Sequence, residues 1–129
     1  MAKYKRNIFK RYKKNIGELV KTYPHLFNKR LPLPLAIGIL EQLANDGLSG
    51  LSKTEIRDCL AVWTKRLEYV KQCRRADAVR FNLNGTPSEP VSKEHKARAK
   101  IMYAMKKYKI RESHREKKAK QLEDDHPDF

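Results

Sequence analysis

Cysteine and long apolar runs are both scarce in this sequence of 129 residues. The two cysteines, Cys59 and Cys73, have no other Cys or His at the spacing of a zinc site, so we expect buried or incidental thiols rather than a metal site or a disulfide. The longest apolar stretch, residues 31–40, is interrupted by two prolines and a glycine, and it falls short of the roughly 20 residues that span a bilayer. The N-terminus is too charged for a signal peptide. We therefore expect a protein of the reducing cytoplasm that makes no membrane contact.

Signatures of catalysis are missing as well. The sequence contains no glycine-rich phosphate loop, no cluster of metal ligands and no nucleophile beside a base. The histidines lie in four different segments, as His25, His95, His114 and His126. We expect a protein that is not an enzyme and that uses no metal, cofactor or small-molecule substrate.

Acidic residues are half as numerous as basic ones, with fifteen against thirty, and the formal net charge is +15. The excess is uneven along the chain. Residues 1–14 carry +7 and residues 93–120 carry +9, whereas residues 15–92 carry only +3 and the last nine residues carry −4. This charge predicts a polyanionic partner, with nucleic acid favoured over a membrane surface or an acidic protein.

Two helices are predicted in the first third of the chain. Apolar residues recur at helical spacing over residues 8–23, and Pro24 ends this helix because the residue before a proline disfavours the helical conformation. The core anchors expected at its end are Tyr23, Leu26 and Phe27. An extended connector at residues 31–34 precedes a second, short helix over residues 35–44, which residues 45–47 terminate.

Residues 51–85 are the most informative stretch. Ser52 and Glu55 form a predicted capping box at the start of a helix that extends to residue 67. Such a start exposes backbone N–H groups and the positive end of the helix dipole, where a phosphate can bind. One face of this helix is apolar. The other face, where we expect phosphates, presents Lys53, Arg57, Ala61, Thr64 and Lys65.

A small β-hairpin is predicted next. Residues 69–72 and 78–83 have the pattern of two short strands, joined by an exposed basic turn at residues 73–77. Asn84-Gly85 predicts a type I′ hairpin turn. Arg80 faces away from the apolar side of its strand, so it is either solvated or holds a ligand.

A last helix begins after Pro90 and Ser92 in this interpretation, and residues 111–120 are either an undocked helix or disordered. The stripe expected to dock this helix consists of Ala97, Ile101, Ala104, Met105 and Tyr108. The predicted fold is therefore mainly α with a small β-hairpin, of the α+β class. We divide the chain into a basic, partly helical extension at 1–14, one domain at 15–108, and a charged tail at 109–129.

Several short motifs stand in a recognisable order. They are Tyr23-Pro24-His25-Leu26-Phe27, Pro34-Leu35-Ala36-Ile37-Gly38-Ile39, Leu51-Ser52-Lys53-Thr54-Glu55-Ile56-Arg57, Trp63-Thr64, Tyr69, Arg80 and Asn84-Gly85-Thr86-Pro87. In this order the sequence resembles the ProQ/FinO family of bacterial RNA-binding proteins over residues 8–108. The resemblance implies an RNA chaperone that acts in post-transcriptional regulation. Its expected partners are small RNAs and transcript 3′ ends, bound through a terminator hairpin and its uridine tail, and we expect a monomer.

The resemblance also implies roles for individual residues. Ser52, Lys53 and Thr54 would hold the phosphates of the RNA 3′ end, with Arg57 near the stem or tail backbone. The pocket for the terminal nucleotide would be lined by Tyr69 and Arg80. The remaining candidates for RNA contact are Thr64, Lys65, Arg74 and Arg75. Spacing alone slightly favours a simple cap at Ser52, a half-buried strand residue at Tyr69 and a solvated Arg80; the order of the motifs reverses this preference in favour of a binding site.

Two alanines depart from the family pattern, since Ala36 and Ala61 stand where many members carry a lysine and an arginine. Both changes should remove charge that faces phosphate. The alternative function is a DNA-binding regulator, because residues 35–45, a turn and residues 52–67 have the outline of a helix-turn-helix. Against it, the second helix offers no Asn or Gln to read adenine.

Overall fold

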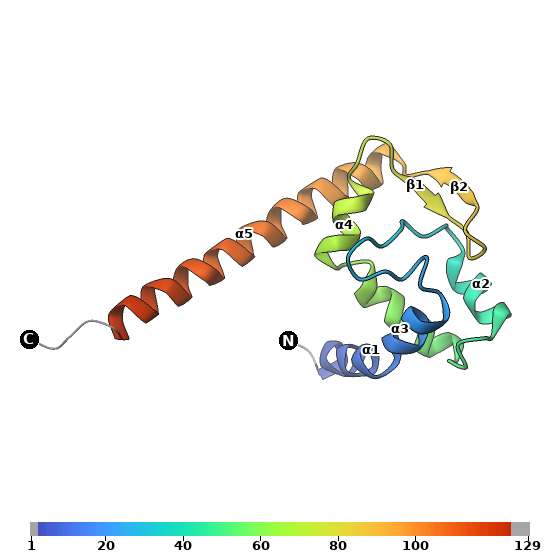
Figure 1. The fold of residues 1–129 in the computed structure, drawn as a ribbon, viewed down its shortest axis with the longest axis horizontal. Helices are drawn as coiled ribbons and strands as arrows, with labels where there is room; N and C mark the ends of the chain where they lie inside the picture. Colours follow the sequence, from blue (N-terminus) through green and yellow to red (C-terminus); the bar gives the residue numbers. More distant parts are fainter. Residues whose placement is uncertain (1–2, 125–129) are drawn as a thin grey trace, which may run out of the picture.

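The computed structural model of the chain describes residues 3–124, so the acidic residues Asp125 and Asp128 of the predicted tail lie outside the described residues. Five helices and a two-stranded sheet follow one another along the chain (Figure 1). They are α1 (Lys3–Thr22), α2 (Ile39–Asp46), α3 (Lys53–Trp63), α4 (Leu67–Cys73), β1 (Val79–Phe81), β2 (Pro87–Pro90) and α5 (Lys93–Asp124). The predicted mainly α fold with a small β-hairpin is confirmed. None of the helices in the described part of the chain has the length and apolar character needed to cross a membrane.

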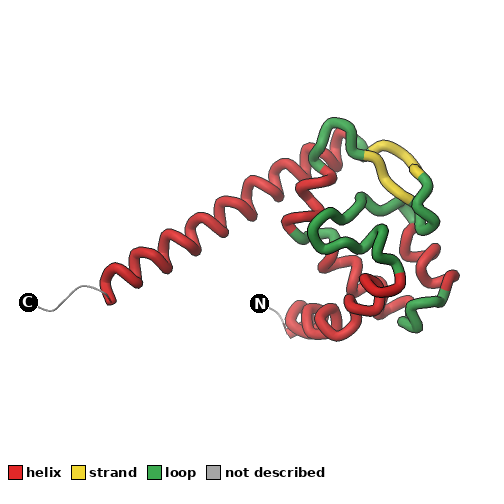
Figure 2. The backbone as a smooth tube through the Cα atoms, in the orientation of Figure 1, coloured by secondary structure: helices red, strands yellow, loops and turns green. Residues whose placement is uncertain are grey.

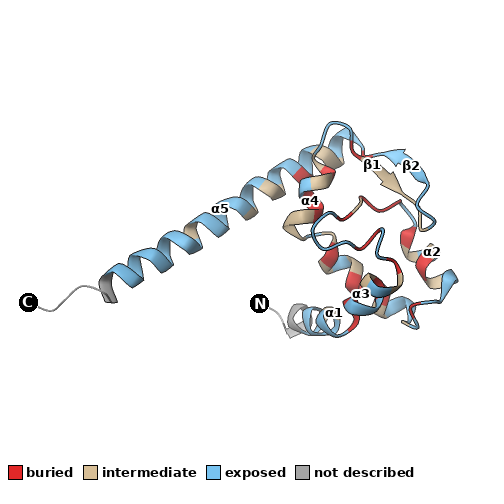
Figure 3. Ribbon diagram, in the orientation of Figure 1, coloured by how far each residue is buried: buried red, intermediate tan, exposed pale blue. Residues whose placement is uncertain are grey.

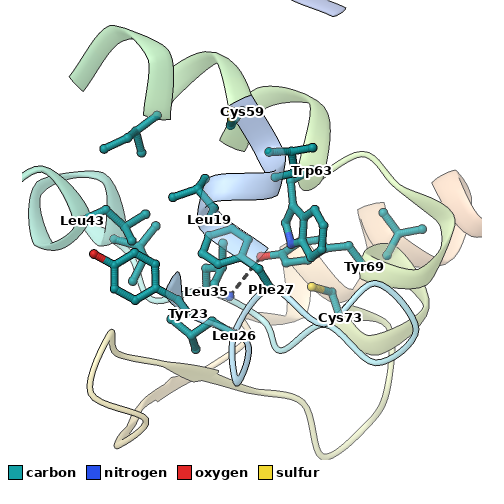
Figure 4. Packing of buried hydrophobic residues seen from close by; sticks show 14 of the residues in the cluster. Leu19, Tyr23, Leu26, Phe27, Leu35, Leu43, Cys59, Trp63, Tyr69 and Cys73 are labelled. Carbon is teal, nitrogen blue, oxygen red and sulfur yellow. Dashed lines mark hydrogen bonds between the residues drawn. The ribbon is translucent and has the colours of Figure 1, made fainter. Parts of the chain in front are cut away.

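The core lies where α1 packs on α3 and where the loop after α1 closes over both helices. Trp63, at the end of α3, is fully buried, and its ring lies 5.2 Å from the ring of Phe27 at an angle of 60° (Figure 4). Tyr23, Leu26 and Phe27 are core residues, as predicted, and both cysteines are buried. The buried residues are concentrated in this half of the molecule (Figure 3).

The second helix begins later than predicted, at Ile39 instead of residue 35. Leu35 instead bridges Phe81 in a parallel pairing, in which Ala36 N donates to Phe81 O (2.9 Å) and Phe81 N donates to Pro34 O (2.8 Å). These bonds satisfy the carbonyl of Pro34 and the amide of Ala36 in an extended conformation, so the chain pairs with the strand before it enters the helix. The loop before α2 therefore runs alongside β1 (Figure 2).

Residues 69–72, predicted as a strand, belong to helix α4. The aromatic and β-branched side chains favoured the strand, but Tyr69, Val70 and Cys73 all bury one helical face against the core. Arg66 marks the corner between α3 and α4, where its guanidinium lies 4.5 Å from the Trp63 ring. Tertiary packing thus overrides local strand propensity here.

The hairpin turn at Asn84-Gly85 is confirmed, but the type I′ conformation is wrong. A type I′ turn requires positive φ at both central residues, and of these two only Gly85 has it (φ 85°). Asn82 N donates to Thr86 O (2.9 Å) and Gly85 N to Asn82 O (2.9 Å). These bonds close a three-residue loop that places its glycine in the left-handed region.

Helix α5 docks through a different face from the one predicted. The five residues of the predicted stripe are not buried, and Ile101, Met105 and Tyr108 are 62, 56 and 61% exposed. The docked face instead contains Ala99, Met102 and Tyr103, because α5 packs on α4 and Arg74 lies over the Tyr103 ring (4.2 Å). Residues 111–120 are helical, and the second half of α5 extends away from the other elements (Figure 1).

The ion pair between α1 and α3 provides a test of this packing. Arg11 Nε donates to Asp58 Oδ2 (2.8 Å), and the Asp58 carboxylate is buried. We expect Arg11→Met to lower the free energy of unfolding in urea by about 2 kcal/mol, because it leaves a buried carboxylate without its charged partner. Arg30→Met, at an exposed arginine of the loop after α1, should change it by less than about 0.5 kcal/mol. Equal effects would contradict a role for this pair.

Candidate nucleic-acid interface

The N-terminus of α3 carries the predicted capping box. Glu55 N donates to Ser52 Oγ (3.1 Å), and Ser52 N donates to Glu55 Oε1 (2.9 Å). The hydrogen bond from the Ser52 amide lowers the pKa of Glu55, so this helix end holds a carboxylate of its own. The first-turn amides of Lys53 and Thr54 have no acceptor within the helix and face solvent. The site can meet a phosphate through these two amides and the Lys53 side chain.

A cavity of about 210 Å³ lies at the other end of α3. Thr64 contributes from the end of α3, Tyr69 from α4 and Arg80 from β1. The first three turns of α5 close it. The complete lining is Thr64, Tyr69, Val70, Cys73, Arg80, Val91, His95, Arg98, Ala99 and Met102.

The peptide groups on either side of Leu35 connect the two predicted pocket residues. Leu35 N donates to the Tyr69 hydroxyl (3.1 Å), and Leu35 O accepts from Arg80 Nη1 (2.9 Å). Figure 4 shows the Tyr69 hydroxyl directed at the Leu35 amide. Tyr69 is only 6% exposed, and burial raises the pKa of its phenol, which is therefore neutral. Tyr69 forms a wall of the cavity and does not offer an open ring face.

The cavity combines cationic groups with apolar walls. Arg80 and Arg98 carry positive charge, and His95 Nδ1 lies 2.7 Å from Arg80 Nη2. None of the described residues that line the cavity is acidic. Arg80 is held by a carbonyl and an imidazole, which are neutral acceptors, so its charge is not cancelled by a carboxylate. The cavity suits an anionic group attached to a flat or apolar moiety.

The predicted candidates occupy both ends of one helix and do not form a single pocket. Helix α3 has 11 residues and is about 16 Å long. Exposed side chains of Arg57 and Ala61 lie between the capped start and the cavity. Lys65 is exposed just beyond the helix, and the exposed Lys53 forms an ion pair with Glu41 (2.5 Å). The arrangement is an exposed line along α3 that ends in a cavity.

Two of the arginines predicted to contact RNA, and one of the two alanines that depart from the family pattern, lie away from this line. Arg74 packs over Tyr103, and Arg75 pairs with Asp77 (3.5 Å), so neither lines the cavity. Ala36 is 3% exposed, because its backbone pairs with β1 and its side chain is buried, so this alanine itself offers no surface to a phosphate. Ala61, in contrast, is on the exposed face of α3.

His95 and Arg98 line the cavity without being among the predicted site residues. The sequence indicates where α5 begins, since a capping serine recurs at Ser92, whose Oγ accepts from His95 N (3.2 Å). No local pattern shows that the first turns of α5 lie across α4 and β1. The packing of α5 brings these two residues to the cavity, whereas the sequence shows only that this region is basic.

Comparisons with known proteins agree with this architecture. A sequence model described as the ProQ/FINO family matches residues 9–121. The chain is 35% identical over 112 residues to "RNA chaperone ProQ" of Histophilus somni (strain 2336), covering 83% of this chain and 52% of that protein. It is 33% identical over 109 residues to "RNA chaperone ProQ" of Shewanella amazonensis, covering 79% and 48%. The chain thus spans about half the length of these curated relatives.

A solved structure is similar as well. The solution structure of a ProQ homolog from Legionella pneumophila, determined by NMR, superposes with a TM-score of 0.54 at 25% sequence identity. The match covers 66% of this chain and 74% of that one.

Tyr69→Phe separates the structural role of this residue from any contact with a ligand. The change removes the acceptor of the buried Leu35 amide and preserves the ring, so we expect a decrease of about 1–2 kcal/mol in the free energy of unfolding in urea. Tyr108→Phe, at an exposed tyrosine of α5, is the matched control and should have no measurable effect. Equal stability of the two variants would show that the Leu35 bond contributes nothing.

Proposed function

The chain belongs to the ProQ/FinO family, and on that premise we propose that it is an RNA-binding protein of the RNA chaperone type that acts in post-transcriptional regulation. The observation that carries the proposal is the cavity with Arg80, Arg98 and His95 and without an acidic lining residue among those described. Each RNA nucleotide joins an anionic phosphate and a flat base through its ribose, and such a cavity suits this combination. The relatives named as RNA chaperones support RNA as the partner.

The ligand we propose is the 3′ end of a structured RNA, namely a terminator hairpin followed by a uridine tail, as found on small RNAs and transcripts. Its terminal nucleotide would enter the cavity beside Arg80, where the walls exclude water from a base. The preceding phosphates would follow α3 past Arg57 towards the amides of Lys53 and Thr54. The chain would work as a monomer in the bacterial cytoplasm, without catalysis.

The basic flanks are proposed to add attraction that does not depend on sequence. The second half of α5 contains many basic residues that are exposed to solvent, and this half of the helix is coloured mostly as exposed in Figure 3. At the other flank, α1 exposes Lys10, Lys13 and Lys14. Lysines of this kind bind phosphates through counterion release, which makes affinity fall with salt.

The pocket is tested by varying the RNA 3′ end. We expect a hairpin with a free 3′-OH uridine tail to bind more tightly than the same hairpin with a 3′-phosphate, and more tightly than duplex DNA at the same salt.

Arg80→Met should weaken binding of the hairpin with the free 3′-OH tail about 10- to 100-fold, because a charge-assisted contact contributes about 1.5–3 kcal/mol. The control Arg30→Met should bind normally. Fluorescence anisotropy measures all of these affinities.

Equal affinity for both 3′ ends would exclude the pocket as the site of the terminus. Tighter binding of duplex DNA would favour the alternative, a DNA-binding regulator that uses α2 and α3.

The role of the tail is tested by removing residues 109–129. This segment contains six basic and six acidic residues, so its deletion leaves the net charge at +15. We expect the slope of log affinity against log salt to become shallower by about one for each phosphate that the tail binds in the full chain. An unchanged slope would show that the tail does not contact RNA. Because the deletion leaves the net charge of the protein the same, a change in overall charge cannot account for either outcome.

A further inference from the structure

We infer that His95 is a ligand-responsive positioning residue of the cavity: an anionic group of the RNA replaces its contact with Arg80, and His95 takes up a proton as it does so. The inference rests on the proposed function, because RNA supplies the anion. It concerns a residue that neither the sequence pattern nor the family resemblance assigns to the site.

The contact with Arg80 requires that Nδ1 of the imidazole accept a hydrogen bond. Arg80 Nη2 and His95 Nδ1 are 2.7 Å apart. A guanidinium can only donate hydrogen bonds, so Nδ1 must hold a lone pair and the ring proton must reside on Nε2. This bond therefore requires the tautomer with its proton on Nε2, and a ring protonated on both nitrogens could not form it.

None of the described charged groups that line the cavity with His95 favours its protonation in the absence of an anion. β1 contributes Arg80 and α5 contributes Arg98, both cationic. α4 contributes Tyr69 and Cys73, which are neutral because burial raises the pKa of each. The end of α3 contributes only the uncharged Thr64.

The carboxylates close to His95 in the sequence do not change this balance. Glu94 precedes it in α5 and Glu89 lies in β2, and both are exposed and outside the lining of the cavity. No negative charge from the described lining therefore compensates a proton on the imidazole.

An RNA phosphate in the cavity would reverse the balance. Arg80 could turn its Nη2–H from the His95 imidazole to the phosphate, while its Nη1–H stays bonded to Leu35 O. The protonated His95 would then donate to the same anion, and the anion would offset the repulsion between the two cations. Because the complex binds one more proton than the free protein, linkage requires that affinity increase as pH falls, by at most tenfold per pH unit for one proton.

The test measures RNA affinity of the full chain between pH 8 and pH 6 at fixed ionic strength. The probe is a terminator-type hairpin with a free 3′-OH uridine tail. We expect binding to tighten by about three- to tenfold across this range. Calorimetry at pH 6.5 in two buffers with different ionisation enthalpies should show net proton uptake on binding.

His95→Gln is the diagnostic variant, because its amide oxygen can accept from Arg80 but does not titrate. We expect its affinity to be independent of pH over this range. His25→Gln and His114→Gln should keep the response of the unmodified chain, since His25 bonds to Leu83 O (2.8 Å) and His114 is exposed on α5. Nitrogen NMR of the ring provides a second readout without a variant: we expect a proton on Nε2 alone in the free protein at pH 7, and on both nitrogens in the complex.

The outcomes distinguish the role of His95 from the proposed function. RNA binding with no pH response, or with the same response in His95→Gln, would overturn the role of His95 and leave the proposed function intact. Absence of RNA binding at any pH would overturn the proposed function and this inference together.

Discussion

The arrangement of the cavity depends on the backbone of one residue, Leu35. Its amide is satisfied by the Tyr69 hydroxyl and its carbonyl by Arg80, so this short piece of backbone fixes the position of α4 relative to β1. The same residue bridges Phe81, which keeps the loop extended beside the strand. Each bond contributes only about 1 kcal/mol net, but the groups are largely buried and leaving any of them unpaired costs more. Disrupting this backbone would therefore displace both polar walls of the cavity at once.

Two arginines of this protein illustrate opposite uses of the same side chain. Arg11 pairs with the buried carboxylate of Asp58, and the charges cancel in a contact that joins α1 to α3. Arg80 is held at two atoms, by a carbonyl and an imidazole. Neutral acceptors orient a guanidinium and leave its charge available, whereas a carboxylate neutralises it. The acceptor that an arginine meets thus decides whether its charge stays available to a ligand in a chain with many basic residues.

The sequence is sufficient to predict features that neighbouring residues decide. The capping box at Ser52 and the turn at Gly85 each depend on a few adjacent positions, and the structure contains both. The sequence is insufficient where distant segments compete for one residue. Tyr69 has the propensity of a strand residue, but the core provides a helical site for it. In α5, alanines and large apolar residues occur around much of the helix, so the pattern does not decide which face docks, and it gives no sign that His95 reaches the cavity.

Helix α5 combines two kinds of helical stability in one continuous element of 32 residues. Its first turns are stabilised by packing, so their amides should exchange with solvent only when the domain unfolds. Its second half has mainly local interactions, and Lys107, Arg111 and Arg115 place like charges four residues apart, where they repel. The exposed ion pair of Glu112 with Arg115 (3.2 Å) offsets little of that repulsion. The helicity of this half is therefore coupled to its ionic surroundings: counterions or a polyanion that neutralise the repulsion lengthen the helix, while the packed domain beside it stays unchanged.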